Sequence, residues 1–331
     1  MPIPFILAGV ALVAGGYGVK KGVDAKRDFS EASDTNDNAN SLVNRAQKSL
    51  EATRDQTQLQ IEDLGKAKLL AYESGLIPFV NAFSKLQNVD FKECKIDGEF
   101  AFSEAALAEL TASAGYMSPL LLSGISSVGA GGLAGLAAFG GAGLFAAAST
   151  GTPIAALSGV AATNATLAWF GGGALSAGGL GMAGGTAVLG GIVAGPVLAV
   201  GGMILASKAE SAKHAAYENL AKAKIAAEEM KSAETVAEGI FTAFLHVNDV
   251  IAQLMERFVP LLSVVQNAVA SNTDYRRHPE HIRKGIMMAA ATASTIRKII
   301  DKPLLSESGT VIEKSVLQID HLHTEIVEEL S

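Results

Sequence analysis

Acidic and basic side chains are absent from one long part of this sequence. Between residues 110 and 207 there is no Asp, Glu, Lys, Arg or His, although 18% of the 331 residues are charged. This uncharged stretch also holds most of the chain's 35 glycines, so it is apolar and poor in bulky side chains. A helix needs about 20 apolar residues to cross a bilayer, so the stretch is long enough for up to about four crossings. It is therefore predicted to enter a membrane.

The chain also has a single cysteine, few aromatic residues and no excess of basic charge. The single cysteine, Cys94, excludes a disulfide within the chain and a zinc site of the usual cysteine spacing. Aromatic residues make up 6% of the chain, and Ala and Gly replace the bulky residues that normally fill a core. The net charge is −7 and neither flank of the uncharged stretch is basic, which argues against a nucleic-acid partner.

No arrangement of residues typical of catalysis or of cofactor binding is found. Residues 179–184 match a dinucleotide fingerprint, but they lack a preceding strand and the acidic residue about 20 positions later that it requires. His278 and His281 are close in sequence, yet a metal site would need further ligands of the right type. Around them lies a basic cluster, Arg276, Arg277, Arg283 and Lys284, which is interpreted either as a solvated loop or as a contact with anionic lipid or an acidic partner. We expect no catalytic residue, no cofactor and no metal.

A second apolar segment lies near the N-terminus. Residues 2–19 are uncharged, and a basic cluster follows them, made up of Lys20, Lys21, Lys26 and Arg27. A secretory signal carries its positive charge before the apolar run, so this order disfavours a cleaved signal. Two interpretations stay open: insertion in a membrane with the basic cluster at the cytoplasmic surface, or burial of a helix against the larger apolar region.

Helical periodicity dominates both sides of the uncharged stretch. Residues 28–89 carry a narrow apolar stripe at steps of three and four, formed by Leu42, Ala46, Leu50, Thr53, Thr57, Ile61 and Leu64. Ser103 is the predicted N-cap of the next helix. Residues 208–272 form a second long helix, which Pro260 is expected to bend or end. Its heptad seam consists of Ile240, Phe244, Val247, Ile251, Leu254 and Phe258. Two more helices are predicted at residues 280–300 and 310–330.

These patterns predict an all-α fold, an elongated bundle of long helices that flank a Gly/Ala-rich apolar helical hairpin region. Four segments are expected along the chain. They are an apolar N-terminal segment (1–27), a first part of the helical body (28–109), a membrane-inserting region (110–207) and a second part of the helical body (208–331).

Small residues recur every four positions inside the uncharged stretch, in the manner of a glycine zipper. This spacing places them on one helix face, where two backbones can approach closely, as helices do when they associate in lipid. Glycine at this density would destabilise a water-exposed helix by about 1 kcal/mol per residue. The predicted helix-packing positions are Gly131, Gly135, Gly173, Gly181, Gly185, Gly191 and Gly195.

Bulky apolar residues of the same stretch are predicted to supply the area that anchors it in lipid. They are Leu120, Leu121, Leu122, Phe139, Leu144, Phe145, Trp169 and Phe170. Burying a Leu or Phe side chain is worth about 1.5–3 kcal/mol, so exposing the region to water would be costly. A water-soluble form must hide it and insertion must be triggered. The heptad seam is expected to hold the bundle together or to join subunits.

Long helices on both sides of an apolar segment resemble α-helical pore-forming proteins of the haemolysin E and tripartite enterotoxin type. The Ala/Gly-rich blocks at residues 129–148 and 178–202 resemble those of apolipoprotein L-like proteins. Residues 161–173, AATNATLAWFGGG, resemble a phrase that recurs in uncharacterised bacterial proteins. The first resemblance implies a soluble helical bundle that stores an apolar hairpin and releases it on insertion. The apolar region here is longer than the hairpin of those proteins, and the apolar segment 2–19 is additional.

The sequence therefore predicts a membrane-inserting protein, pore-forming or membrane-perturbing, that acts on a lipid bilayer as a homo-oligomer or with related helical subunits. It would be membrane-associated, with a soluble cytoplasmic form before insertion. The alternative is a constitutive membrane scaffold that recruits a cytosolic partner, with Lys20, Lys21 and Lys208 placing the polar flanks on the cytoplasmic side. A third hypothesis is a wholly soluble protein whose core contains an Ala/Gly-packed helix pair.

Overall fold

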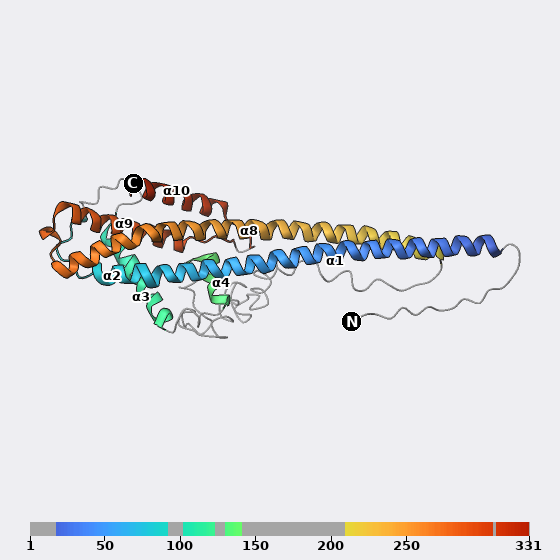
Figure 1. Ribbon diagram of the computed structural model, residues 1–331, viewed down its shortest axis with the longest axis horizontal. Helices are drawn as coiled ribbons and strands as arrows, with labels where there is room; N and C mark the ends of the chain where they lie inside the picture. Colours follow the sequence, from blue (N-terminus) through green and yellow to red (C-terminus); the bar gives the residue numbers. More distant parts are fainter. Residues whose placement is uncertain (1–17, 92–101, 123–129, 141–208, 307–308, 331) are drawn as a thin grey trace. The chain divides into compact units, whose positions relative to one another are not determined.

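The computed structural model describes residues 18–91, 102–122, 130–140, 209–306 and 309–330, and these described residues are helical without a named strand (Figure 1). The all-α prediction is confirmed. The helices are α1 (Gly18–Ala71), the π-helical turn η1 (Tyr72–Leu76), α2 (Ile77–Phe83), α3 (Glu104–Leu122), α4 (Ala130–Phe139), α8 (Ala209–Ser271), the 3₁₀ turn η6 (Tyr275–Arg277), α9 (Glu280–Asp301) and α10 (Glu313–Glu329).

The chain divides into two compact units. Unit 1 comprises Met1–Glu51 and Pro196–Ser232, and unit 2 comprises Ala52–Gly195 and Ala233–Ser331. Helix α1 starts at Gly18 and is continuous to Ala71, so the predicted segment boundary after residue 27 falls inside a helix. The two long helices each contribute residues to both units.

In unit 1 the described residues belong to α1 and α8, which run parallel. Glu31 accepts hydrogen bonds from Lys213 and from Tyr217, each at 2.8 Å, and Asn219 donates to Asn36 at 3.2 Å. The partners in α8 lie 182 to 186 residues beyond those in α1, and both sets advance together. The core between the helices is small-residue rich, formed by Ala32, Ala39, Val43, Leu50, Ala216, Ala223, Ala226 and Met230.

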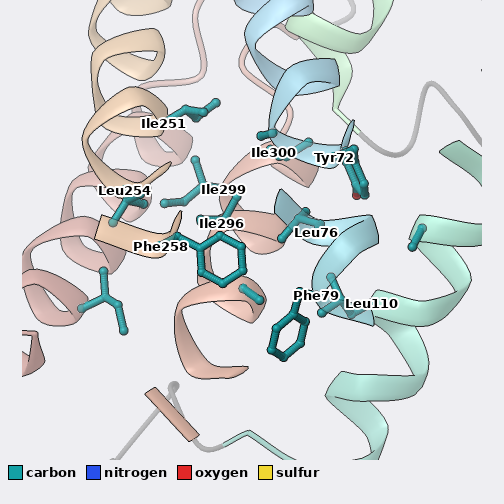
Figure 2. Packing of buried hydrophobic residues seen from close by; sticks show 14 of the residues in the cluster. Tyr72, Leu76, Phe79, Leu110, Ile251, Leu254, Phe258, Ile296, Ile299 and Ile300 are labelled. Atoms are coloured by element: carbon teal, nitrogen blue, oxygen red, sulfur yellow. The ribbon is translucent and has the colours of Figure 1, made fainter. Parts of the chain in front are cut away.

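Unit 2 continues the parallel pairing and adds a dense hydrophobic core. Thr57 donates a hydrogen bond to the carbonyl of Ala237 at 3.2 Å, again with an offset of about 180 residues. Aromatic and branched aliphatic side chains from α1, η1, α2, α3, α8, α9 and α10 meet in one cluster (Figure 2). The rings of Phe79 and Phe258, from α2 and α8, have centroids 5.9 Å apart. Parallel helices require a long connection between them, and residues 72–208 provide it.

The predicted heptad seam of α8 lies inside this core. All six residues, Ile240, Phe244, Val247, Ile251, Leu254 and Phe258, are at most 1% exposed. The seam holds the chain's own helices together, so in this conformation its side chains are not accessible to a second chain.

Several local expectations can be compared with the helix boundaries. Ser103 caps α3 as predicted, because its hydroxyl accepts from the amide of Ala106 at 3.2 Å. Of the two alternatives predicted for Pro260, a bend or an end of the helix, the second is excluded because α8 continues to Ser271. Proline removes the amide that would bond to the carbonyl of Glu256, but both residues are exposed and water can replace that amide.

Candidate functional site

Helix α4 is the part of the uncharged stretch that packs most deeply among the described residues. Its sequence, AGGLAGLAAF, contains no polar side chain. The six consecutive residues 133–138 are all buried, so this part of the helix is covered on every face. A helix that is apolar all round is stable only when it is completely covered, by protein or by lipid. Here, protein covers this part of α4.

Gly65 of α1 allows α4 to approach closely. A Cβ atom added to Gly65 would lie 2.4 Å from the carbonyl oxygen of Leu133 and 2.9 Å from its Cα atom. Both are backbone atoms and cannot rotate away, so any side chain at position 65 would push the two helices apart. Gly65 lies outside the uncharged stretch and is not one of the predicted helix-packing glycines.

Lys68 joins the C-terminal ends of α4 and α9. Its Nζ atom donates to the carbonyls of Leu136 at 3.1 Å, Ala137 at 3.0 Å and Ile300 at 3.1 Å. These carbonyls belong to the last turns of the two helices, where the helix dipole favours a cation, and that of Leu136 also accepts from the amide of Gly140 at 3.1 Å. The side chain of Lys68 is completely buried.

Charge around Lys68 is arranged across three helices. Burial lowers the pKa of Lys68 to about 7, and the nearby Asp301 carboxylate opposes this shift. Burial also raises the pKa of Asp301, while Arg297, 3.2 Å from it, acts in the opposite direction. Arg297 also pairs with Glu109 of α3. An ammonium group has three N–H donors and the three carbonyls only accept, so the protonated form satisfies all of them.

A glycine and two backbone amides complete the anchoring of α4. Gly140 follows the helix with a positive φ of 59°, and a Cβ atom there would lie 2.5 Å from the backbone of Asp301. The amides of Leu304 and Leu305 donate to the carbonyl of Ala138 at 2.7 Å and 3.1 Å. A left-handed glycine after the last turn is a common helix terminator. The α4 clamp, defined as Gly65, Lys68, Gly140 and these hydrogen bonds, fixes the end of α4.

The predicted site residues fall into three groups. Gly135 is buried in α4 and Leu121 is half-buried against the core. Leu120, Leu122, Gly131 and Phe139 lie in helices α3 and α4, but their side chains are not described. Outside the described residues lie Leu144, Phe145, Trp169, Phe170, Gly173, Gly181, Gly185, Gly191 and Gly195.

Sequence reasoning overlooked Lys68, although a signal was present. Lys68 comes four residues after Leu64 and so continues the apolar stripe of α1, where a charged side chain is unexpected. A lysine at such a position has to find partners inside the protein. The identity of those partners depends on two other helices and is not encoded near Lys68.

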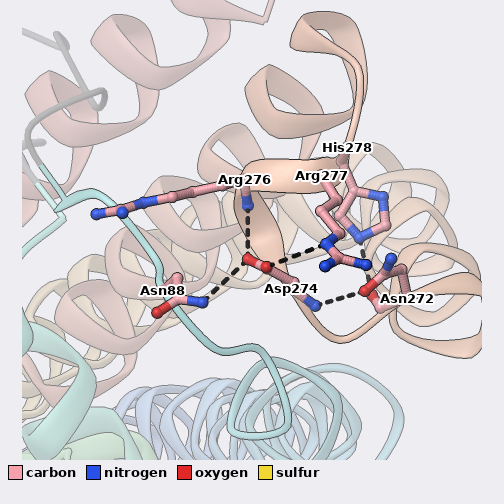
Figure 3. A network of polar contacts seen from close by, with 6 residues as sticks. All are labelled: Asn88, Asn272, Asp274, Arg276, Arg277 and His278. Carbon is pink, nitrogen blue, oxygen red and sulfur yellow. Dashed lines mark hydrogen bonds and ion pairs between the residues drawn. The ribbon is translucent and has the colours of Figure 1, made fainter.

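The basic loop around His278 is built by backbone and side-chain contacts (Figure 3). The carboxylate of Asp274 accepts from Asn88 at 3.1 Å and from the amide of Arg276 at 3.2 Å, and it pairs with Arg277 at 3.5 Å. His278 is buried, with Nε2 2.8 Å from the carbonyl of Asn272. These contacts give the loop a structural role in connecting α8 and α9.

Within the described ranges, no group of three or more His, Cys, Asp or Glu side chains is placed to hold a metal ion. Among the helices that the structure describes, none is both long and apolar enough to cross a bilayer. Comparisons with protein families, with curated proteins and with solved structures found no match to this chain.

Proposed function

We propose that this protein inserts its uncharged Gly/Ala-rich region into lipid bilayers and permeabilises or perturbs them. In this proposal the helical body is the water-soluble part that stores the region and releases it. The oligomer that acts on the membrane is built from copies of this chain or from related helical subunits.

The observation that carries the proposal is the covering of α4. This helix has no polar side chain, and lipid could cover it as well as protein does. It belongs to the uncharged stretch, whose remaining residues would follow it into a membrane. Storage of an apolar helix against a helical body is what a protein with a soluble form and an inserted form requires.

The α4 clamp supports storage that can be reversed. Hydrogen bonds and one buried cation hold the end of α4, and these bonds exchange readily with water once the helix moves. Departure of α4 removes two of the three carbonyl acceptors of the buried Lys68 and leaves that of Ile300, so the helical body would have to rearrange around Lys68. Release of α4 is therefore expected to be a cooperative step and not a gradual loosening.

A constitutive membrane scaffold that recruits a cytosolic partner is the alternative. It would use the same apolar region as a permanent anchor and the helical body as the recruiting surface. Basic residues at the boundaries, Lys20, Lys21 and Lys208, support this orientation. The two functions differ in whether the protein can be obtained without detergent and whether it empties vesicles.

The proposed function is tested by release of a fluorescent dye from liposomes, using protein purified without detergent. We expect wild-type protein to release dye and Gly65→Ala to release it faster, because the added Cβ would displace the backbone of Leu133 and weaken storage of α4. Gly239→Ala is the matched control. It makes the same change in a long helix, but a Cβ there has no atom within 4 Å, so its release should equal that of wild type.

The outcomes separate the hypotheses. Protein that is extracted only with detergent and never releases dye supports the scaffold. Soluble protein that leaves vesicles intact, even as Gly65→Ala, contradicts both membrane functions. Equal acceleration by Gly65→Ala and Gly239→Ala would show that α4 storage does not control release.

A further inference from the structure

The parallel pairing of α1 and α8 brings two distant parts of the sequence to one end of unit 1. Glu31 contacts Lys213 and Tyr217, and Asn36 contacts Asn219, so the order of contacts along both helices is the same. The N-terminal ends of α1 and α8 therefore lie at the same end of this unit, as Figure 1 shows.

Each of these helices is preceded in sequence by an apolar segment. Residues 1–17 before α1 have no acidic or basic side chain, and the uncharged stretch ends one residue before Lys208, which precedes α8. Because both helices start at the same end of unit 1, each of the two apolar segments connects to the helix pair there. An antiparallel pair would have separated these entry points by the length of the unit.

Charge along α1 changes sign within a short distance from this end. Residues 18–27 contain four basic residues and one acidic residue, whereas residues 28–37 contain four acidic residues and no basic one. At the start of α8, residues 208–213 contain two basic residues and one acidic residue, and Lys213 pairs with Glu31 of α1. A basic band between an apolar segment and an acidic one is the pattern that anionic lipid headgroups attract.

We propose that this end of unit 1, formed by residues 18–27 of α1 and residues 209–213 of α8, docks on an anionic lipid bilayer that both preceding apolar segments enter. The basic band meets the headgroups, and the acidic residues 28–37 keep the rest of unit 1 away from the surface. The inference rests on the proposed function for the membrane affinity of residues 110–207. It adds the partner surface and the requirement that residues 1–17 enter the same membrane.

The basic loop of unit 2 provides the comparison that the test needs. Arg276, Arg277 and Lys284 are exposed and basic, but they lie beside Asp274 and Glu280, and the apolar residues that follow them, 286–296 of α9, are almost all buried in the core of unit 2. If net charge alone directed binding, neutralising three residues there would matter as much as neutralising three residues at the start of α1.

Vesicle flotation with the full chain measures docking. Vesicles of phosphatidylcholine with about one third phosphatidylserine are expected to bind wild type, and the triple variant Lys20→Gln, Lys21→Gln, Lys26→Gln should bind about 100-fold more weakly. The control variant Arg276→Gln, Arg277→Gln, Lys284→Gln should bind as wild type does. Raising the salt should reduce the difference, since exposed charges are screened. Equal weakening by both variants overturns the proposal.

Depth of insertion tests whether both helix starts reach the same membrane. In a Cys94→Ser background, a fluorophore is attached at Gly22→Cys, Ser211→Cys or Asn40→Cys, and brominated lipids serve as quenchers. Quenching at positions 22 and 211 but not at the exposed position 40 is expected. Quenching at only one of the two helix starts would overturn shared docking.

Docking and permeabilisation can fail separately. Charge-dependent binding and paired quenching without dye release would leave docking intact and contradict the proposed permeabilisation. Dye release that is unchanged in the triple variant, with no quenching at positions 22 and 211, would leave permeabilisation intact and contradict docking.

Discussion

Units 1 and 2 use the same two parallel helices, but they stabilise them in different ways. In unit 1 the buried positions are mostly alanine, and a half-buried hydrogen bond joins Asn36 to Asn219. In unit 2 the same helices carry Phe, Leu and Ile and are covered by further helices. Buried apolar area per residue is therefore much larger in unit 2, and stabilisation scales with that area.

Under the proposed function, this difference in packing gives the two units different roles. A dense core provides a rigid support on which α4 can be stored, and the α4 clamp lies entirely within unit 2. Two Ala-rich helices open at lower free energy, which under the proposed function suits the unit whose helices follow the membrane-entering apolar segments.

Truncation of a core side chain should cost more in unit 2 than in unit 1. Phe258→Ala removes a fully buried ring that packs on Phe79, and we expect the free energy of unfolding of unit 2 to fall by about 3–5 kcal/mol. Leu50→Ala, also at a buried position, should cost about 2 kcal/mol because a two-helix contact can close over the cavity. Hydrogen exchange measured along the chain reports both values. Equal losses would contradict the contrast between the units.

Lys68 should make unit 2 more stable as the pH rises above neutrality. The folded-state pKa of about 7 lies below the ordinary value of 10.5, so the unfolded state binds more protons between these values. This contribution to stability is present above pH 10.5 and is lost as the pH falls towards 7. Between about pH 7 and 9 it should change by about 2 kcal/mol relative to Lys68→Met, measured by urea unfolding.

Lys66→Met is the matched control for the pH dependence. Lys66 lies two residues away on the same helix, is exposed, and pairs with Asp63 at 3.0 Å. Its replacement should leave the pH profile of wild type unchanged. If Lys68→Met and wild type have parallel profiles, the buried amine does not change protonation in this range.

Helix content followed from the sequence because amphipathic periodicity is a local property. The second long helix was predicted at residues 208–272 and is found at Ala209–Ser271. The apolar stripe of α1 was predicted to start at Leu42, but the buried residue there is Val43, one position later, and Leu42 is half-buried. The buried side of α1 is set by its pairing with α8, and that pairing continues from Ala39 to Val43.

The parallel direction of the α1–α8 pair and the contacts between residues far apart in the sequence could not be predicted from the sequence. An apolar stripe is equally satisfied by a parallel or an antiparallel partner, so the contact of Glu31 with Lys213 could not be anticipated. The α4 clamp has the same origin, since Lys68 meets carbonyls of residues that are 68 and 232 positions away. Every residue has a backbone carbonyl, so residue type does not indicate which carbonyls Lys68 will contact. Only the fold brings these three carbonyls to Lys68.

The smallest expected effect concerns the register of the helices in unit 1. Asn36 and Asn219 form a polar pair at the contact between α1 and α8, and such a pair fixes register at a cost in stability. Replacing both with Leu should raise the stability of unit 1 by about 1 kcal/mol and allow the helices to shift along each other. Spin labels at Ser33→Cys and Ala215→Cys, both exposed positions, in a Cys94→Ser background would then show a broader distance distribution than with the asparagines present. An unchanged distribution would mean that the salt bridge of Glu31 with Lys213, 2.8 Å long, is sufficient to set the register. Since the parallel register places both helix starts at one end of unit 1, loosened register should also weaken docking on anionic vesicles.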